Sequence, residues 1–532
     1  MNRYMNFKYI KNIIPTAAVC LSLGLGSCVN DLDVTPIDPS TNMEADYDAL
    51  FNKCYANMAL AGNGGANGDC DIDGLDGGTT GFVRQLFNAN ELTTDESICC
   101  WGDEGIPAFN YNQWGASHPM LKGFYYRLYF GVTMCNFYLT EAAEYDATMT
   151  AEVRFLRAMY YYHLMDCFGN IPFLTEVSSE PAKQATRQQV YSFIETELLE
   201  IVDELKAPMT GTYGRADQAA AWLLLSRLYL NAEVYTGKAE WAKAAQYAQM
   251  VMNSAYKLHT TPKGEWSAYQ MLFMGDNGEN GAQCEAILPL LQDGLTTTSW
   301  GTSLFLMAST FKADMTLVGT ATNGTTELWA GNRARPDFVA KFFPNGDAPA
   351  VTTAEMVVAA KDDRALLWGK DRTLSVDDVT DFASGYSVAK FTNFYTSGTA
   401  KHSQFPDTDY FLMRAAEAYL TFAEADTRAN NGTITTEAKA AIDAIRARAN
   451  ANIKNTYSLN DILDEWSREF YYEGRRRIDL IRFGKFGGNS DYKWQWKGGS
   501  KEGTTFNSHL NIFAIPDTDL NANPNLKQND GY

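Results

Sequence analysis

Three parts of the chain place small and large apolar side chains at the spacing of an α-helix. Alanines recur beside leucines, as at Ala219, Ala220, Leu223 and Leu224. Small residues at regular positions let neighbouring helices approach closely, as they do in stacked helix–turn–helix repeats. The pattern therefore predicts three helical hairpins. They comprise Lys122–Phe168 with a break near Asp146–Thr150, Arg215–Tyr235 joined to Trp241–Ser254, and Asp409–Asn430 joined to Thr435–Ala451.

The pattern changes between residues 259 and 408, where Gly, Thr, Asn and Asp dominate and aromatic residues are scattered. Two short runs there, 286–291 and 387–394, are typical of β-strands. A long irregular region inside a helical protein usually carries function. A first helix at 44–61 and a loop at 62–81 precede the hairpins. We therefore predict a mostly α fold, a tetratricopeptide-like scaffold of helical hairpins with long irregular loops and a few short strands.

The amino terminus is typical of a secretory signal followed by an acylation site. Its first eleven residues carry three positive charges and no acid, and an apolar stretch from Ile13 to Leu25 follows. That stretch is too short for a membrane span, which needs about 20 apolar residues. It ends in Leu25-Gly-Ser-Cys28, which is similar to a bacterial lipobox, so Cys28 is the predicted lipidation site. The alternative is an ordinary cleaved signal with an incidental cysteine.

These patterns divide the chain into five predicted parts. They are a signal peptide at 1–27, a lipidated tether at 28–42, a helical region at 43–258, a loop-rich ligand-binding insertion at 259–408 and a second helical region at 409–532. The lipid on Cys28 would hold the body to a membrane, because each buried methylene of an acyl chain contributes about 0.8 kcal/mol.

Charge and composition narrow the class of ligand. The formal net charge is −20, and removal of the signal with its three cations leaves −23. A surface of that charge repels nucleic acid and anionic lipid headgroups, and it suits a neutral or cationic ligand. Aromatic residues make up 13% of the chain. Some of these rings are therefore expected on the surface, where Tyr and Trp serve recognition.

Catalytic and metal-binding motifs are missing from the sequence. It contains no H-E-x-x-H, G-x-S-x-G, G-x-G-x-x-G, P-loop or C-x-x-C pattern, and no two of its five histidines lie close together. Its 64 acidic residues make a chance pair of carboxylates nearly certain, so a glycosidase pair is neither indicated nor excluded. The oxygen-rich loop Asp276-Asn-Gly-Glu-Asn280 is a candidate site for structural calcium, although an ordinary turn is the favoured interpretation.

Five segments carry motifs, in order, along nearly the whole mature chain. They are Ala151–Phe173, Gly214–Asp217 leading into Leu228–Leu230, Leu412–Ala425, Arg468–Gly484 and Phe513–Tyr532. Each motif alone is modest, but five in order behind a lipobox are highly specific. Together they resemble the SusD/RagB family of nutrient-binding outer-membrane lipoproteins. One departure is that Trp466-Ser467 stand where the family often has further Arg before Glu469, which can cost a salt bridge.

The charged residues of these motifs have a structural interpretation of their own. Helices rich in apolar residues carry four of them, namely Arg154, Arg157, Glu417 and Glu424. We expect these to pair between helices, since an unpaired buried charge is costly. Arg475–Arg477 follow Glu469 and Glu473 at helical spacing, which predicts i,i+4 pairs. The family motifs therefore mark the scaffold, and the ligand site is sought elsewhere.

Aromatic residues in polar loops are the best candidates for ligand binding. Carbohydrate presents flat apolar faces edged by hydroxyls, so its site needs aromatic planes and hydrogen-bonding groups. Trp101 is the main candidate, with Asp76 and Arg84 upstream and with Trp300 and Trp329 in the irregular region. Starch-binding family members are similar in having an acidic Gly-rich loop, an Arg and then a loop Trp. We predict an aromatic arc for a helical glucan; the alternative is that each Trp caps a hydrophobic edge under a loop.

The resemblance implies a cell-surface glycan-binding lipoprotein of the outer membrane. It would capture oligosaccharide or polysaccharide, with a starch-like glucan as the first candidate, and deliver it to a SusC-like TonB-dependent transporter. Neither catalysis, nor a required cofactor, nor a nucleic-acid partner is implied. The first alternative is a binder of peptide or glycoprotein-derived glycan with the same delivery role. The second is a glycoside-processing enzyme.

Overall fold

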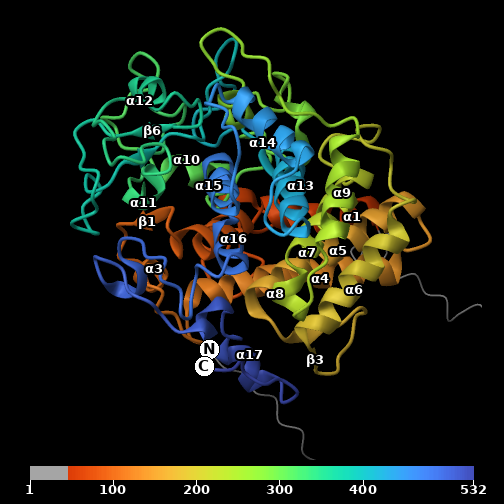
Figure 1. Ribbon diagram of the computed structural model, residues 1–532. Helices are drawn as coiled ribbons and strands as arrows, with labels where there is room; N and C mark the ends of the chain where they lie inside the picture. Colours follow the sequence, from red (N-terminus) through yellow and green to blue (C-terminus); the bar gives the residue numbers. More distant parts are fainter. Residues whose placement is uncertain (1–45) are drawn as a thin grey trace, which may run out of the picture. The chain divides into compact units, whose positions relative to one another are not determined.

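Helices are the main elements of residues 46–532, which the computed structural model describes (Figure 1). The predicted signal peptide, Cys28 and the predicted tether lie outside the described residues. Residues 47–532 form one unit, so the predicted limits at 258 and 408 mark changes in composition and stay untested as domain boundaries. The mostly α fold predicted from the sequence is confirmed.

All three predicted hairpins are present. They consist of α4 (Pro119–Glu141) with α5 (Ala147–Phe168), of α7 (Gln218–Leu230) and α8 (Ala232–Thr236) with α9 (Trp241–Met252), and of α13 (Ala415–Ala429) with α14 (Thr436–Arg448). Side-chain caps fix where they begin. The Asp146 carboxylate accepts the N–H of Met149 at the start of α5, and Asp217 accepts that of Ala219 at the start of α7.

The remaining helices lie before, between and after the hairpins. They are α1 (Tyr47–Ala59), α2 (Phe82–Phe87), α3 (Ile106–Asn110), α6 (Arg187–Ile201), α10 (Ser303–Ala308), α11 (Pro336–Val339), α12 (Thr353–Ala360), α15 (Leu459–Phe470), α16 (Arg476–Arg482) and α17 (Asp517–Ala522). Among residues 46–532, none of these helices combines the length and the apolar character that a membrane crossing requires.

A glycine lets the two helices of the first hairpin pack face to face. A Cβ built on Gly131 of α4 would lie 2.4 Å from Cζ of Tyr160 on α5, so only glycine leaves room for this ring. The Tyr160 hydroxyl passes beyond the helix and donates to the carbonyl oxygen of Cys54 in α1, at 2.9 Å. The small-residue pattern thus has the packing role that the sequence indicates.

The described strands form four antiparallel pairs. They pair β1 (Ser97–Cys99) with β5 (Asn332–Ala334), β2 (Ile171–Phe173) with β3 (Lys183–Ala185), β4 (Ala286–Leu290) with β8 (Tyr410–Arg414), and β6 (Leu367–Trp368) with β7 (Ser387–Val388). The strand predicted at 286–291 is confirmed, whereas only two residues of 387–394 are strand. The start of the third hairpin was predicted wrongly, because Tyr410–Arg414 is a strand and the helix begins at Ala415.

Buried ion pairs tie the helices together, as the motif residues predict. Arg154 and Arg157 both bind Glu197 of α6, at 2.7 and 2.9 Å. The other two pairs are Glu417 with Arg227 and Glu424 with Arg482.

The predicted i,i+4 pairs of Arg475–Arg477 with Glu469 and Glu473 are wrong; the i,i+4 pair that does form joins Arg475 to Asp479. Tyr472 and Gly474 have φ values of 64° and 75°, so the chain leaves helical geometry between α15 and α16. The three arginines instead reach acids elsewhere. Arg475 pairs with Glu417 and Asp479, Arg476 with Asp95, and Arg477 with Asp166.

Candidate functional site

The structure brings the three predicted loop tryptophans together into one group, which we call the tryptophan cluster. The Trp329 ring lies between the other two, with its centroid 6.5 Å from that of Trp101 and 6.2 Å from that of Trp300. The planes are inclined by 53° and 44°, so the rings follow a curve rather than a flat wall. Each tryptophan is partly exposed. The predicted aromatic arc therefore exists as geometry.

Strand pairing explains why residues so far apart in sequence meet here. In the β1–β5 pair Cys99 lies opposite Asn332, and the next amide, that of Cys100, donates to the carbonyl oxygen of Gly331 at 3.1 Å. Trp101 follows β1 and Trp329 precedes β5, so both lie at the same end of this antiparallel pair. The Trp329 amide also donates to the carbonyl oxygen of Ala308 in α10, at 2.7 Å.

Each indole N–H of the cluster donates to a protein acceptor. Trp101 donates to the carbonyl oxygen of Ala330 at 3.3 Å, and Trp300 to that of Ala66 at 3.0 Å. Trp329 donates to Oε2 of Glu327 at 2.9 Å. These bonds fix the ring orientations before a ligand arrives, which lowers the entropy lost on binding.

Arg84 packs against Trp101 and is largely buried. Its guanidinium carbon lies 5.6 Å from the ring centroid of Trp101 and 5.1 Å from that of Phe305, which is within the range of a cation–π contact. Arg84 is only 9% exposed. Burial lowers its pKa from the usual arginine value, while nearby acids, Asp103 and Asp76, oppose that change. An arginine pKa starts so high that the group stays charged at neutral pH.

Asp76 borders the cluster at Trp300. It is exposed, and its Oδ1 accepts the backbone N–H of Thr79 at 2.9 Å. A Cβ built on Gly78 would lie 3.0 Å from Cβ of Trp300 and 3.2 Å from Oδ1 of Asp76. The acidic Gly-rich loop therefore lies directly against one end of the arc, and its carboxylate remains open to solvent.

Four residues of this site were missed by the sequence analysis. Phe305, Glu327 and Phe405 contact the cluster through rings or a hydrogen bond, and Gln404 binds Glu327. The Phe405 ring lies 4.8 Å from Trp300, and Gln404 donates to Oε1 of Glu327 at 3.1 Å. Glu327 had a signal, because it lies two residues before Trp329 in a polar loop, and so did Phe405, an aromatic residue in the polar segment 401–409.

The candidate calcium loop is already organised by hydrogen bonds. Oδ2 of Asp276 accepts from the backbone N–H of Thr396 at 2.9 Å and from its hydroxyl at 2.6 Å, while Oδ1 accepts from Asn280 at 3.0 Å. Within the part of the chain that the structure describes, no three His, Cys, Asp or Glu side chains gather as a metal site. Calcium at Asp276 stays a prediction.

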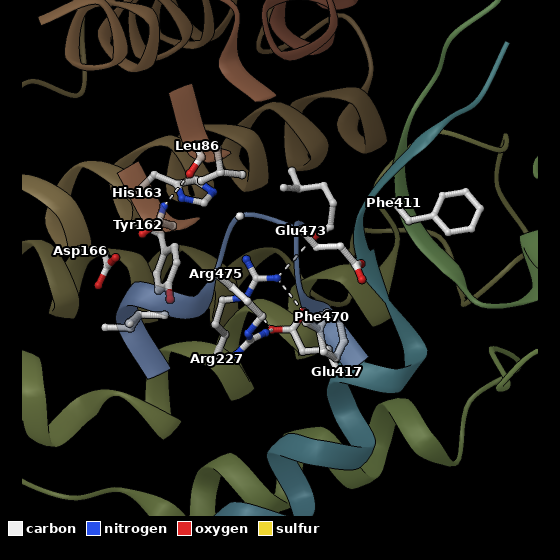
Figure 2. Close-up of a pocket in the computed structure, with 14 residues that line it drawn as sticks. Leu86, Tyr162, His163, Asp166, Arg227, Phe411, Glu417, Phe470, Glu473 and Arg475 are labelled. Carbon is white, nitrogen blue, oxygen red and sulfur yellow. Dashed lines mark hydrogen bonds and ion pairs between the residues drawn. The ribbon is translucent and has the colours of Figure 1, made fainter. Parts of the chain in front are cut away.

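A second feature is a small charged cavity whose lining includes Arg227, Glu417 and Arg475 (Figure 2). Arg227 and Arg475 converge on Glu417 there, at 2.7 and 3.1 Å. His163 lines it too and is buried, and burial lowers its pKa to about 3. The cavity volume is about 40 Å³, which suits water, whereas small-molecule sites span about 300 to 1,000 Å³. The His163 ring packs against those of Phe82 and Tyr162, at 5.5 and 5.4 Å between centroids, which is a helix-packing role.

Comparisons with known proteins find a relative that matches nearly the whole chain. A family model described as "SusD family" matches residues 317–532, and one described as "Starch-binding associating with outer membrane" matches residues 32–230. The starch-binding protein SusD of Bacteroides thetaiotaomicron is 41% identical, across 99% of this chain and 100% of that protein. A SusD-like protein of Bacteroides ovatus is 24% identical, across 71% of this chain and 68% of that one.

Solved structures agree in fold. A SusD superfamily protein from Parabacteroides distasonis superposes with a TM-score of 0.67 at 20% identity, covering 91% of this chain and 98% of that one. A laminarin-binding SusD-like protein gives 0.64 at 22% identity, covering 92% and 99%. These structures confirm the fold, and the 41% identity over nearly the whole chain confirms the resemblance inferred from the five motifs.

Proposed function

The chain belongs to the SusD family, and from that premise we propose that it binds glycan, a starch-like glucan first, at the tryptophan cluster. The observation that carries the proposal is the curved, partly exposed row of Trp101, Trp329 and Trp300. A helical glucan presents successive apolar sugar faces along a curve, and aromatic planes bind such faces. Asp76 at the edge of the row can accept hydrogen bonds from sugar hydroxyls.

Trp101→Ala tests this site. We expect the affinity for amylopectin and maltoheptaose, measured by affinity electrophoresis and calorimetry, to fall about tenfold or more, because one stacked ring is lost. Trp222→Ala is the matched control, since Trp222 is also a partly exposed ring and lies on α7 outside the cluster. Unchanged glucan affinity in a folded Trp101→Ala protein would refute the site, and failure of every polysaccharide in a panel would refute the function.

The alternative ligand is peptide or glycoprotein-derived glycan, bound in the same delivery role. The large share of aromatic residues is compatible with it, but the curvature of the row favours a glucan. A positive peptide pull-down from a protein that fails to bind any glucan would decide for this alternative. Catalysis is the least favoured possibility; product release from a glycan, abolished by one Asp or Glu substitution, would establish it.

The cellular role follows from the family. We infer outer-membrane attachment through a lipid on Cys28, exposure on the cell surface, and delivery of glycan to a SusC-like TonB-dependent transporter. Support comes from the lipobox and from the family description of outer-membrane association. Cys28→Ala should release or mislocalise the protein, as fractionation would show, while its glycan affinity stays unchanged. Co-purification of the wild-type chain with a transporter tests the partner.

We further propose that glycan binding needs no cofactor, since the cluster and its polar edge are made by side chains alone. Calcium at Asp276 would then be structural. Calorimetry in EDTA should give the same glucan affinity as calorimetry in calcium, whereas a calcium-dependent rise in the melting temperature that Asp276→Asn abolishes would support a structural ion.

A further inference from the structure

A second concave surface, which we call the tyrosine groove, lies on the first helical hairpin. Four tyrosines, two carboxylates and an asparagine define it: Tyr125, Tyr126 and Tyr129 of α4, Tyr161 of α5, Glu176, Asp519 and Asn523. Its volume is about 320 Å³, and none of its lining residues belongs to the tryptophan cluster. This volume lies at the lower end of the range for small-molecule sites, about 300 to 1,000 Å³.

Hydrogen bonds hold the tyrosine rings in place. The Tyr129 hydroxyl donates to the carbonyl oxygen of Pro172 at 2.6 Å, and the Tyr161 hydroxyl to that of Leu174 at 2.5 Å. The Tyr125 hydroxyl donates to Asp519 of α17. The ring centroid of Tyr125 lies 4.7 Å from that of Tyr129 and 5.5 Å from that of Tyr126. Tyr125 and Tyr161 are buried, so the preorganised ring surface that a ligand can cover, at little cost in entropy, is that of the partly exposed Tyr126 and Tyr129.

The charges of the groove select against an anionic occupant. Its fifteen lining residues include the carboxylates of Glu176 and Asp519 and no Lys, Arg or His. Carboxylates accept hydrogen bonds, and tyrosine oxygens whose protons are already donated can only accept more. A matching ligand is therefore neutral or cationic, rich in hydrogen-bond donors and flat on at least one apolar face. Neutral carbohydrate fits this description, and it is the class of ligand proposed for the tryptophan cluster.

We propose that the tyrosine groove is a second carbohydrate site, which binds a short neutral gluco-oligosaccharide independently of the tryptophan cluster. The inference rests on the proposed glycan-binding function, because the same class of ligand is bound at both places. Two sites on one receptor raise the avidity for a long polysaccharide without any new contact, provided that one chain can span them. They also raise the number of short chains that each receptor holds.

Maltotriose binding by the Trp101→Ala protein tests the proposal, because the main site is weakened there. We expect wild-type protein to bind two equivalents in calorimetry, and Trp101→Ala to retain the weaker one, with saturation transfer in ligand-observed NMR. Adding Tyr126→Ala should weaken that residual binding by about three- to tenfold, as expected for loss of one ring. Tyr126 suits the test because it is partly exposed and its hydroxyl contacts Thr518 at 2.7 Å, near the surface.

Two control variants separate loss of the ring from loss of the fold. Tyr126→Phe keeps the ring face and should keep the residual affinity. Tyr145→Ala removes a 53% exposed tyrosine outside the groove and should change nothing. If wild-type protein binds one equivalent and Trp101→Ala binds none, or if Tyr126→Ala has no effect, the groove proposal is overturned and the proposed function stands. If wild-type protein binds no glycan, the proposed function itself fails.

Discussion

Gly331 sets the position of Trp101, which lies at one end of the tryptophan cluster. A Cβ built there would lie 2.3 Å from Cε2 of Trp101, so the indole can cross this backbone only because no side chain is present. We expect Gly331→Ala to displace the ring and to lower glucan affinity about tenfold in calorimetry, since a stacking face is turned away. Gly102→Ala is the matched control, because a Cβ there meets nothing within 4 Å. Equal affinity in both variants would contradict this role.

Asp409 makes stability depend on pH. Burial raises its pKa to about 7, although the N–H of Gln292 and the hydroxyl of Tyr213 donate to it. The unfolded pKa is about 3.9. Between these values the folded chain holds a proton that the unfolded chain releases, so the stability contribution is full below pH 4 and is lost as the pH rises to 7.

Asp409→Asn should flatten this dependence. From pH 5 to pH 8 the free energy of unfolding of the wild type should fall by about 2 to 3 kcal/mol more than that of the variant, at 1.36 kcal/mol per pKa unit. Urea unfolding at the two pH values measures the difference. Parallel changes in both proteins would show that other groups control the pH dependence.

Single residues of the site could be predicted to different degrees. Trp101, Trp300 and Trp329 were found because a large ring in a Gly-rich polar loop has little core to join. Phe305 was not found, since it lies among apolar residues that a buried segment would also have. Phe405 lies in the polar segment 401–409, but its contact with Trp300 joins distant parts of the chain, which one sequence does not reveal.

At the scale of elements, α15 holds the C-terminal part together through its acids. Glu469 is fully buried and pairs with Arg414 at 2.7 Å, and it also binds Arg364 and Arg448. Burial alone would raise the pKa of Glu469, but its arginine partners outweigh burial and hold that pKa at about 2. Trp466 on the same helix donates its indole N–H to Glu424 at 2.8 Å. The Trp that stands where the family often has Arg therefore still gives the Glu424 carboxylate a buried partner.

Removal of the Glu469 carboxylate should strongly lower the stability of the fold. Glu469→Ala would leave three buried guanidinium groups short of a partner, and we expect about 3 to 5 kcal/mol of lost stability in urea unfolding. Glu200→Ala removes a 57% exposed side chain that pairs with Arg154, and should cost at most about 1 kcal/mol. A small loss for Glu469→Ala would mean that the arginines find other acceptors.

Periodicity predicted the long helices well and the short strands poorly. In Tyr410–Arg414 all five residues are buried, so the run lacks the alternation that marks a half-exposed strand and resembles a buried helix. That Tyr410–Arg414 is a strand is evident only from its pairing with Ala286–Leu290. Similarly, the break at Tyr472–Gly474 separates two helical patterns that read as continuous in the sequence.

At the scale of the whole described unit, the site joins segments about 230 residues apart. The Cys100 amide bonds to Gly331, and the Trp329 amide bonds to Ala308. Glucan bound across the cluster should therefore slow amide hydrogen exchange at 97–101 and 329–334 together, because opening either segment removes the site. Exchange followed by mass spectrometry with and without maltoheptaose measures this, and the Trp101→Ala protein should show a much smaller effect. Protection confined to one segment would contradict the coupling.

The saturated indole N–H groups have a consequence for selectivity. The indole N–H groups of Trp101, Trp300 and Trp329 all donate to acceptors within the protein. The three rings therefore have no side-chain donor left that could distinguish one arrangement of sugar hydroxyls from another. The arc instead selects ligands by their curvature, so its affinity for a glycan would depend on the helical pitch of the glycan backbone. A receptor of this kind accepts chains of many lengths and branching patterns, provided that they coil.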